Sequence, residues 1–367
     1  MDQTRNAGGG HDGEAVLVHA ERMLHEGEAT AALTLLEDRR QECPATERPY
    51  LNRLIGSALL SLGRHGEAYT TLQTALADPV IDDDDRAHAL LLNVVGNVHH
   101  AGGRFQPATE AFERALRHAE LLCPPDHALC ARVLVNLGVA ALDSGQVEPA
   151  SVYYERAVEA ARLAGDRRRL GMAYMGLGVA RERACDYNAA RAHAEEAVRL
   201  FEQAGEPRLT TQARMNLATV YAEQGAWDVA APHVQHVLTQ ARASGDMATV
   251  AHALEVLAQV ETARGEYDRA AERAAEARIM AENSGDLLEA HIAGVTEAAA
   301  LAALKRPAEA ERRYREAIDY FRVARTSRHF MSASHNYVEA LRSWGRRDEA
   351  RDVLNQAYAF VTSLRQG

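Results

Sequence analysis

The chain has little of what disulfide-stapled, membrane-spanning or aromatic-rich proteins depend on. Only four of its 367 residues are cysteines, and they are too scattered for a disulfide framework in a chain of this length. No apolar run approaches the roughly 18 residues that a membrane helix needs, and the N-terminal sequence MDQTRNAGGGHDGE lacks the apolar segment of a signal peptide. The sequence therefore predicts a soluble cytoplasmic protein without a membrane partner.

Aromatic residues make up only 5% of the chain although 47% of it is hydrophobic, so alanine and leucine must supply most of the packing. The formal net charge is −11. Residues 305–367 differ from the rest, because they carry 13 Lys and Arg against 8 Asp and Glu. An acidic body repels phosphate backbones, which predicts no direct nucleic-acid binding. The basic end could meet an acidic partner or could be a solvated helix surface.

One alanine position recurs along almost the whole chain. It is occupied at Ala32, Ala68, Ala108, Ala150, Ala190, Ala230, Ala270, Ala310 and Ala350. The first three intervals between consecutive alanines are 36, 40 and 42 residues, and each of the five that follow is 40 residues. Such self-similarity at a fixed period is typical of a repeat array, in which each unit is one supersecondary element. We expect residues 13–365 to form a single all-α solenoid domain of about nine antiparallel helix pairs, after a disordered tail of residues 1–12.

Glycines mark both kinds of turn in this array. Within pairs they favour the left-handed conformation that ends many helices, and the exceptions at Cys185 and Lys305 predict looser turns there. Between pairs, a glycine is followed by an acidic residue that can cap the next helix. This second signal occurs at Gly165-Asp166, Gly205-Glu206, Gly245-Asp246 and Gly285-Asp286.

The repeats resemble the tetratricopeptide repeat (TPR) family. The resemblance rests on the Asn-Leu-small motif at residues 136–138 and 216–218, and on the Gly-x-aromatic turns at residues 103–105, 225–227 and 265–267. It implies a right-handed superhelix whose concave face is lined by the first helix of each pair. The 40-residue period is longer than the usual repeat of the family. It is similar to that of bacterial peptide-sensing regulators, Rap-type phosphatase regulators and the sensor halves of transcription activators.

The resemblance also implies a set of groove residues on the first helices. They are polar side chains that could hydrogen-bond an extended peptide, namely Asn93, Asn97, Arg132, Asn136, Arg183, Gln212, Asn216, Gln259, His335 and Asn336. Asparagine is a poor helix former, so its recurrence on one face favours a functional role. The alternative is that these amides bond a neighbouring turn or water.

Some members of the family hold an acidic tail with a clamp of basic residues and asparagines. Asn97 and Asn136 match the asparagines of that clamp, whereas its basic positions hold Asn93, Met172 and Gly176. The sequence therefore does not predict this clamp. Met172, with Met175 and Met215, could instead form an apolar patch on the same face or belong to ordinary packing.

We find no motif for catalysis or for a cofactor. The sequence lacks a Gly-rich phosphate loop, a nucleophile elbow and a His-Glu-x-x-His motif. Cys123, His127 and Cys130 lie close together in sequence, but their spacing matches no common zinc site and a fourth ligand is missing. Rap-type activity resides in a separate N-terminal helical bundle, and the repeats here begin near residue 14. We therefore predict a protein without enzymatic activity, cofactor or metal.

The last predicted helix carries an apolar face without a following helix to cover it. Terminal repeats normally present a polar outer surface, so this face could mediate a homodimer through Tyr358, Phe360, Val361 and Leu364. The alternative is that the helix packs onto its own pair.

Two functions agree with these features. The first is a scaffold or adaptor that binds a protein or peptide in the groove. The alternative is the regulatory sensor module of a peptide-responsive transcription or signalling system that lacks its own DNA-binding domain.

Overall fold

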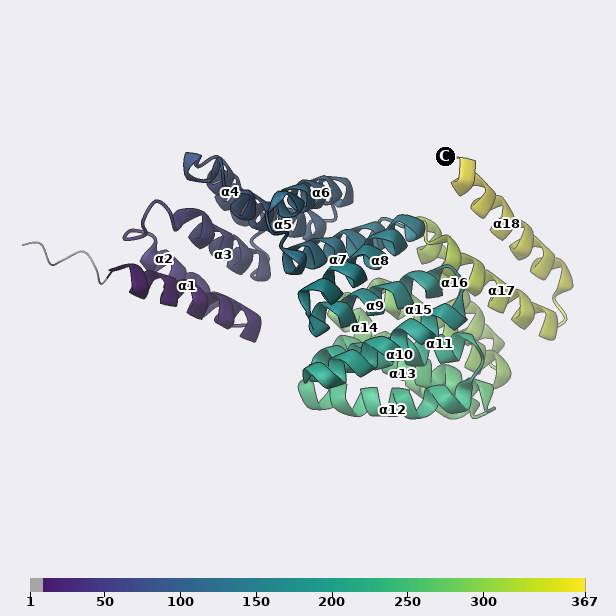
Figure 1. Cartoon of the computed structure of the whole chain (residues 1–367). Helices are drawn as coiled ribbons and strands as arrows, with labels where there is room; N and C mark the ends of the chain where they lie inside the picture. Colours follow the sequence, from purple (N-terminus) through teal and green to yellow (C-terminus); the bar gives the residue numbers. More distant parts are fainter. Residues whose placement is uncertain (1–8, 367) are drawn as a thin grey trace, which may run out of the picture. The chain divides into compact units, whose positions relative to one another are not determined.

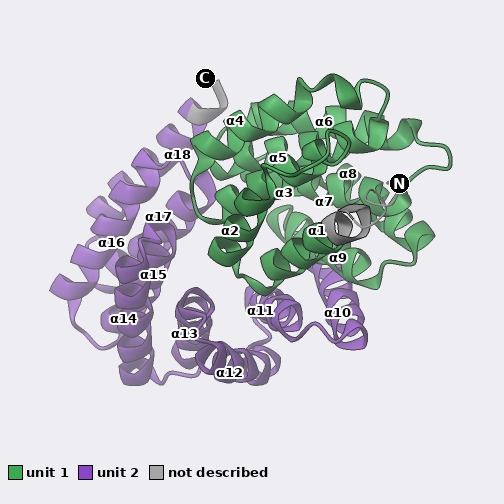
Figure 2. Cartoon of the chain, turned by 90° about the vertical axis from the view of Figure 1, so that its left-hand side faces the viewer, with its two compact units in different colours: residues 1–186 green, residues 187–367 purple. Residues whose placement is uncertain are grey.

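The structure is a computed structural model that describes residues 9–366. Part of the predicted tail, residues 1–8, lies outside this range, and the first helix begins at Gly9, inside the predicted tail. The chain divides into two compact units, residues 1–186 and 187–367, and each is described by itself (Figure 2). The boundary falls between the two helices of the fifth predicted pair. The single superhelical domain over residues 13–365 stays a prediction.

Unit 1 contains nine α-helices and one short 3-10 helix within its described residues (Figure 1). Their bounds are α1 Gly9–Glu26, α2 Ala29–Arg39, α3 Arg48–Ser61, α4 His65–Leu76, η1 Pro79–Ile81, α5 Asp85–Ala101, α6 Phe105–Leu121, α7 His127–Asp143, α8 Val147–Ala164 and α9 Arg167–Arg183.

Unit 2 contains nine further α-helices within its described residues. Their bounds are α10 Tyr187–Ala204, α11 Pro207–Glu223, α12 Trp227–Ser244, α13 Met247–Ala263, α14 Tyr267–Ser284, α15 Leu287–Ala303, α16 Pro307–Val323, α17 Ser327–Ser343 and α18 Arg347–Gln366. The all-α prediction is confirmed, since no strand occurs between Gly9 and Gln366. None of the helices described is long and apolar enough for a membrane crossing.

Consecutive helices pack in pairs, and the odd-numbered helices also pack on one another. In unit 1, α1 contacts α3, α3 contacts α5, α5 contacts α7, and α7 contacts α9. Unit 2 repeats this pattern from α11 to α17. Each unit therefore presents a layer of odd-numbered helices, as expected for stacked repeats. We call its free surface the odd-helix face.

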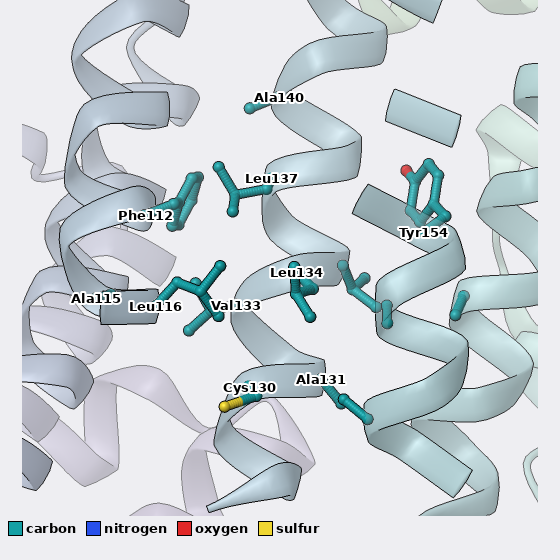
Figure 3. Packing of buried hydrophobic residues seen from close by; sticks show 14 of the residues in the cluster. Phe112, Ala115, Leu116, Cys130, Ala131, Val133, Leu134, Leu137, Ala140 and Tyr154 are labelled. Carbon is teal, nitrogen blue, oxygen red and sulfur yellow. The ribbon is translucent and has the colours of Figure 1, made fainter. Parts of the chain in front are cut away.

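The recurring alanine packs at the centre of each pair. Eight of the nine are fully buried, and Ala350 is 3% exposed. One turn after the alanine, unit 1 places a large side chain that lies against a glycine of the first helix. Phe112 of α6 and Tyr154 of α8 lie on opposite sides of α7 (Figure 3). A Cβ atom at Gly138 would lie 2.6 Å from the Tyr154 ring, and one at Gly176 of α9 would lie closer still. The glycines therefore make room for the largest core side chains.

The predicted caps between pairs are confirmed at three of four links. Gly165, Gly245 and Gly285 end their helices in the left-handed region. Asp166, Asp246 and Asp286 each accept a hydrogen bond from the backbone N–H three residues later. Glu206 makes no such bond. Its helix begins with Pro207, whose fixed φ suits the first helical position.

The prediction of looser turns at Cys185 and Lys305 is wrong. Both residues adopt the left-handed conformation, with φ of 60° and 58°, in place of glycine. The flanking hydrogen bonds are kept as well, because the Cys185 N–H donates to Glu182 at 2.9 Å, as Gly225 does to Ala222. Packing of the two helices sets this geometry and overrides the preference of the local residue.

Candidate functional site

The odd-helix face of unit 1 contains a cavity of about 270 Å³. All five odd-numbered helices of the unit contribute side chains to it. They are Glu21, Leu24 and His25 of α1, Arg53, Leu54 and Ser57 of α3, Asn93, Val94 and Asn97 of α5, Arg132, Val135 and Asn136 of α7, and Arg168, Arg169 and Met172 of α9. We call this cavity the unit 1 groove. The stacking of first helices builds it, because the same face of each helix points into it.

Three asparagines of the groove are bonded to one another. The Asn136 Nδ2 group donates to Asn93 Oδ1 at 2.9 Å and to Asn97 Oδ1 at 3.3 Å. Asn93 is buried at 4% exposure, while Asn97 and Asn136 are partly exposed. Both N–H groups of Asn136 are used in this way, which leaves its Oδ1 able to accept and the Asn97 Nδ2 able to donate. The network holds these amides in place.

Arg132 lies beside this network without an anionic partner. It makes no ion pair with any residue the structure describes, and its buried Nε atom has no hydrogen-bond partner. Burial, together with the positive charges of Arg169 and Arg53, lowers the pKa of the Arg132 guanidinium. Glu21 and Asp126 oppose this effect only in part. Burying an unpaired cation is costly, so this position favours an anion.

The remaining charges of the groove are mostly basic. Its lining includes four arginines and a single glutamate, Glu21. Arg53 Nη2 donates to Glu21 at 3.1 Å, and Arg169 pairs with Asp166 at the start of α9. In a chain with a net charge of −11, this groove is a local concentration of positive charge.

Four of the ten predicted groove residues line this cavity, namely Asn93, Asn97, Arg132 and Asn136. The cavity is also lined by charged residues that were not predicted from the sequence, namely Glu21, Arg53, Arg168 and Arg169. Arg53 could have been found, because it lies 40 residues before Asn93 and so occupies the same repeat position. Arg168 and Arg169 belong to the first turn of α9. Met172 lines the groove, whereas Met215 is a core residue of unit 2.

Unit 2 carries the other predicted residues of the first helices. Gln212 and Asn216 are partly exposed on α11, while His335 and Asn336 are exposed on α17. Gln259 of α13 is already engaged, because its Nε2 donates to Glu255 Oε1 at 2.7 Å. None of these five residues lines the unit 1 groove.

A second polar network occupies the equivalent position in unit 2. Thr296 of α15 donates to Glu255 of α13 at 2.7 Å, on the same carboxylate oxygen that Gln259 bonds. In repeat phase, Glu255, Gln259 and Thr296 correspond to Asn93, Asn97 and Asn136. Glu255 is 2% exposed. Burial and the charge of Glu289 raise the pKa of the Glu255 carboxyl to about 7. The same repeat position thus holds amides in one unit and a buried carboxyl in the other.

Arg183 does not line the groove. Its Nη1 donates to the backbone oxygen of Leu142 at 2.5 Å, near the end of α7. The last carbonyls of a helix have no partner inside the helix, so a neighbouring arginine can satisfy one of them. Its role here is therefore to join α9 to α7.

The apolar face of the last helix is partly covered by its own pair. Phe360 packs on Phe330 of α17 with ring centroids 4.5 Å apart, and Val361 packs against the same core. Tyr358 is 55% exposed. The side chain of Leu364 lies outside the part of the chain whose side chains are described. Self-association through this helix stays a prediction.

The sequence cluster near Cys123 does not assemble into a site. Cys123 is exposed and Cys130 is buried, and both are free thiols. Within the described residues, no three His, Cys, Asp or Glu side chains lie where they could hold a metal ion together.

The stacked helix pairs and the grooved odd-helix face define an α-solenoid repeat protein. The sequence profile of the tetratricopeptide repeat family matches residues 85–162 and 129–203. The recurring alanine and the paired helices continue on both sides of this segment. Residues 85–203 are therefore similar to tetratricopeptide repeats.

Solved structures of similar fold include a Rap protein, an aspartyl phosphate phosphatase and a quorum sensor. A Rap protein complexed with competence and sporulation factor has a TM-score of 0.71 at 12% identity, covering 97% of this chain and 99% of that one. Aspartyl phosphate phosphatase F from Bacillus subtilis has a TM-score of 0.65 at 13% identity, covering 98% and 96%. The quorum sensor NprR from B. thuringiensis, in its apo form, has a TM-score of 0.65 at 15% identity, covering 83% and 86%. A comparison with curated protein sequences gives no match. These likenesses establish the fold.

Proposed function

We propose that the chain is a regulatory tetratricopeptide repeat scaffold that binds a peptide, or an extended segment of a partner protein, in the unit 1 groove. The observation that carries this proposal is the groove itself, where five helices bring amides and arginines to one cavity. Held amides can bond a peptide backbone, which needs donors and acceptors in alternation. The Rap complex with competence and sporulation factor supports the peptide as the ligand class.

We also propose that the protein is cytoplasmic and bacterial, and that it acts by binding without catalysing a reaction. The candidate residues are amides and arginines, and none of them forms a nucleophile–base pair of the kind covalent catalysis requires. One structural neighbour is named a phosphatase, but the likeness is one of fold and does not extend that activity to this chain.

The test is capture of partners from the native host by wild type and by the double variant Asn97→Ala, Asn136→Ala. We expect a peptide or protein partner that the variant loses, since the variant removes the amides that face the groove. The matched control is Asn283→Ala, Asn355→Ala, which makes the same change at exposed positions of α14 and α18. Partners retained equally by all three proteins would refute the groove as the binding site.

The sensor alternative differs from a plain scaffold in its response to the ligand. A sensor needs two states whose populations the ligand shifts, and NprR is a similar fold described as a quorum sensor. Small-angle X-ray scattering with and without the captured ligand separates them. A change in radius of gyration on binding supports the sensor, and an unchanged value supports the scaffold.

A further inference from the structure

Unit 2 contains a cavity of about 430 Å³ between α16 and α18, to which α17 contributes buried side chains. These are Phe330, Ser334 and Tyr337, which share one face of α17 because a helix turns once in about 3.6 residues. His335 and Asn336, which were predicted for the odd-helix face, do not line it and turn away from it. We call this cavity the α17 pocket, and it is separate from the odd-helix face.

At the equivalent place in the preceding repeat, a bridge of ion pairs joins the helices. Arg278 Nε of α14 donates to Glu297 Oε2 of α15 at 2.8 Å, and Arg313 Nε of α16 lies 3.2 Å from the same oxygen. Forty residues later, the corresponding positions hold uncharged side chains that line the α17 pocket, namely Ile318, Tyr337 and Val353. The last repeat therefore has a largely apolar cavity where its neighbour has a polar bridge.

One buried polar group of the α17 pocket has no partner. Ser334 is 1% exposed, and its Oγ atom makes no hydrogen bond with the described residues. Its counterpart forty residues earlier is Gly294, where a Cβ atom would lie 3.7 Å from the Cδ atom of Arg278. A buried hydroxyl without a partner is costly. Because a hydroxyl can both donate and accept, Ser334 can bond one polar group of a ligand.

Aromatic rings form much of the apolar lining. Phe330 of α17 and Phe360 of α18 have ring centroids 4.5 Å apart, and both line the pocket. The hydroxyl of Tyr337 is already used, because it donates to Glu311 at 2.9 Å. Such rings pack well on a further ring in an offset or edge-to-face arrangement, and they attract a cation near their faces. The lining therefore favours an aromatic ligand.

One carboxylate of the pocket has no cationic partner. Asp352 of α18 is exposed and makes no ion pair with any residue that the structure describes. The other charges of the lining are paired, namely Arg315 with Glu311, Arg322 with Asp319, and Glu349 with Arg346. The basic excess of residues 305–367 acts at longer range and is screened by salt over about 10 Å. The local charge at the opening is therefore negative.

We propose that the α17 pocket binds a small aromatic amine that carries a hydroxyl group. The ring packs against Phe330 and Phe360, the hydroxyl bonds Ser334, and the ammonium group reaches Asp352 at the opening. The cavity, at about 430 Å³, falls within the range of about 300–1,000 Å³ that is typical of small-molecule sites. This site goes beyond the proposed function, because it shares no residue with the unit 1 groove.

The test titrates tyramine into the full chain and follows binding by saturation-transfer NMR. Two analogues each lack one of its polar groups. Phenethylamine has no hydroxyl, and tyrosol has a hydroxyl in place of the ammonium group. We expect tyramine to bind most tightly and each analogue to bind about two- to tenfold more weakly, as the loss of one hydrogen bond or ion pair implies.

Two variants assign each polar group of the ligand to its residue. Ser334→Ala should weaken tyramine about two- to tenfold and leave phenethylamine unchanged. Asp352→Asn should weaken tyramine about two- to fivefold, since exposed ion pairs are weak, and leave tyrosol unchanged. The control is Asp348→Asn, an exposed position of α18 outside the pocket, which should leave all three affinities unchanged. Circular dichroism melts check folding, and if Ser334→Ala fails to fold, Asp352→Asn carries the test.

Three results would overturn this proposal. One is that none of the three probes binds at concentrations up to about 10 mM. Another is that tyramine binds equally to wild type, Ser334→Ala and Asp352→Asn, because it would then occupy a different place. The third is tighter binding of 4-hydroxyphenylacetate than of tyramine, since the pocket would then select an anion through Arg315 or Arg322. None of these results bears on the unit 1 groove, which is tested by its own asparagine variant.

Discussion

At the scale of single residues, the turn geometry shows how strongly packing overrides local preference. Cys185, Lys305 and Arg325 all have positive φ values near 60° in turns where other repeats place glycine. A residue with a Cβ atom is disfavoured in this conformation, whereas glycine adopts it freely. These three positions are therefore places where the chain is less stable than its own repeat pattern allows.

We expect Lys305→Gly to raise the free energy of unfolding by about 0.5–1 kcal/mol, because it relieves the left-handed conformation at the end of α15. Leu304→Gly is the control, since Leu304 has a φ of −74° and gains nothing from glycine. Urea unfolding followed by circular dichroism measures both. A Lys305→Gly protein less stable than wild type would contradict the strain.

The buried carboxyl of Glu255 makes the folding stability of unit 2 depend on pH. Its pKa is raised to about 7 by burial and by Glu289, whose own carboxyl is raised to about 7 by burial and by Asp286. The hydrogen bonds from Thr296 and Gln259 and the charge of His252 act in the opposite direction. Since the folded pKa lies above the unfolded value, the stability contribution is complete at low pH and is lost as pH rises toward about 7.

We expect Glu255→Gln to flatten this dependence and to exceed wild type in stability above about pH 7 by on the order of 1–3 kcal/mol. Glutamine keeps an oxygen that can accept from Thr296 and removes the charge. Thermal midpoints measured between about pH 5 and 8 test this, with Glu272→Gln at an exposed position of α14 as the control. Parallel curves for wild type and Glu255→Gln would refute the assignment.

At the scale of helices, close approach depends on a few glycines that face large side chains. Tyr154 is 2% exposed and lies between Gly138 of α7 and Gly176 of α9, so that it fills the space between consecutive first helices. The ring packs against both α7 and α9, the helices that contribute Asn136 and Met172 to the lining of the groove. The shape of the site therefore depends on core packing one layer below it.

We expect Gly176→Ala to lower the free energy of unfolding by about 1–3 kcal/mol, because its Cβ would overlap the Tyr154 ring. Gly294→Ala makes the same change within α15, where the new Cβ would meet only the Arg278 side chain at 3.7 Å. It should be neutral or stabilise by up to about 1 kcal/mol, since alanine favours a helix. Chemical denaturation of both variants decides, and equal effects would contradict the packing account.

At the scale of the whole molecule, the C-terminal helix bears on the oligomeric state. Phe360 and Val361 pack against the core of unit 2, so Tyr358 is the exposed one among the three members of the predicted self-association surface whose side chains are described. We propose that Tyr358 forms the centre of a homodimer contact. Light scattering should show a mass that rises with wild-type concentration and a constant mass for Tyr358→Lys. A wild type that stays monomeric throughout would exclude the contact.

The repeat pattern alone predicted the helices and their pairing. Nine alanines in phase, with glycines at the turns, specify helix pairs because each unit contacts only its neighbours and short sequence distances encode those contacts. The same phase placed Asn97 and Asn136 on one face. It also predicted that Asp166, Asp246 and Asp286 would begin helices.

The tertiary structure alone decided how the polar residues are used. Arg183 and Arg132 both belonged to the predicted groove set, yet one joins two helices and the other lies unpaired in the groove. The difference depends on which groups from other repeats lie within about 3 Å. Residues tens of positions apart converge only when the helices stack, so partner and burial are properties of the folded chain. The periodicity of the sequence encodes the position of a side chain on its helix, and the stacked structure determines what that side chain meets.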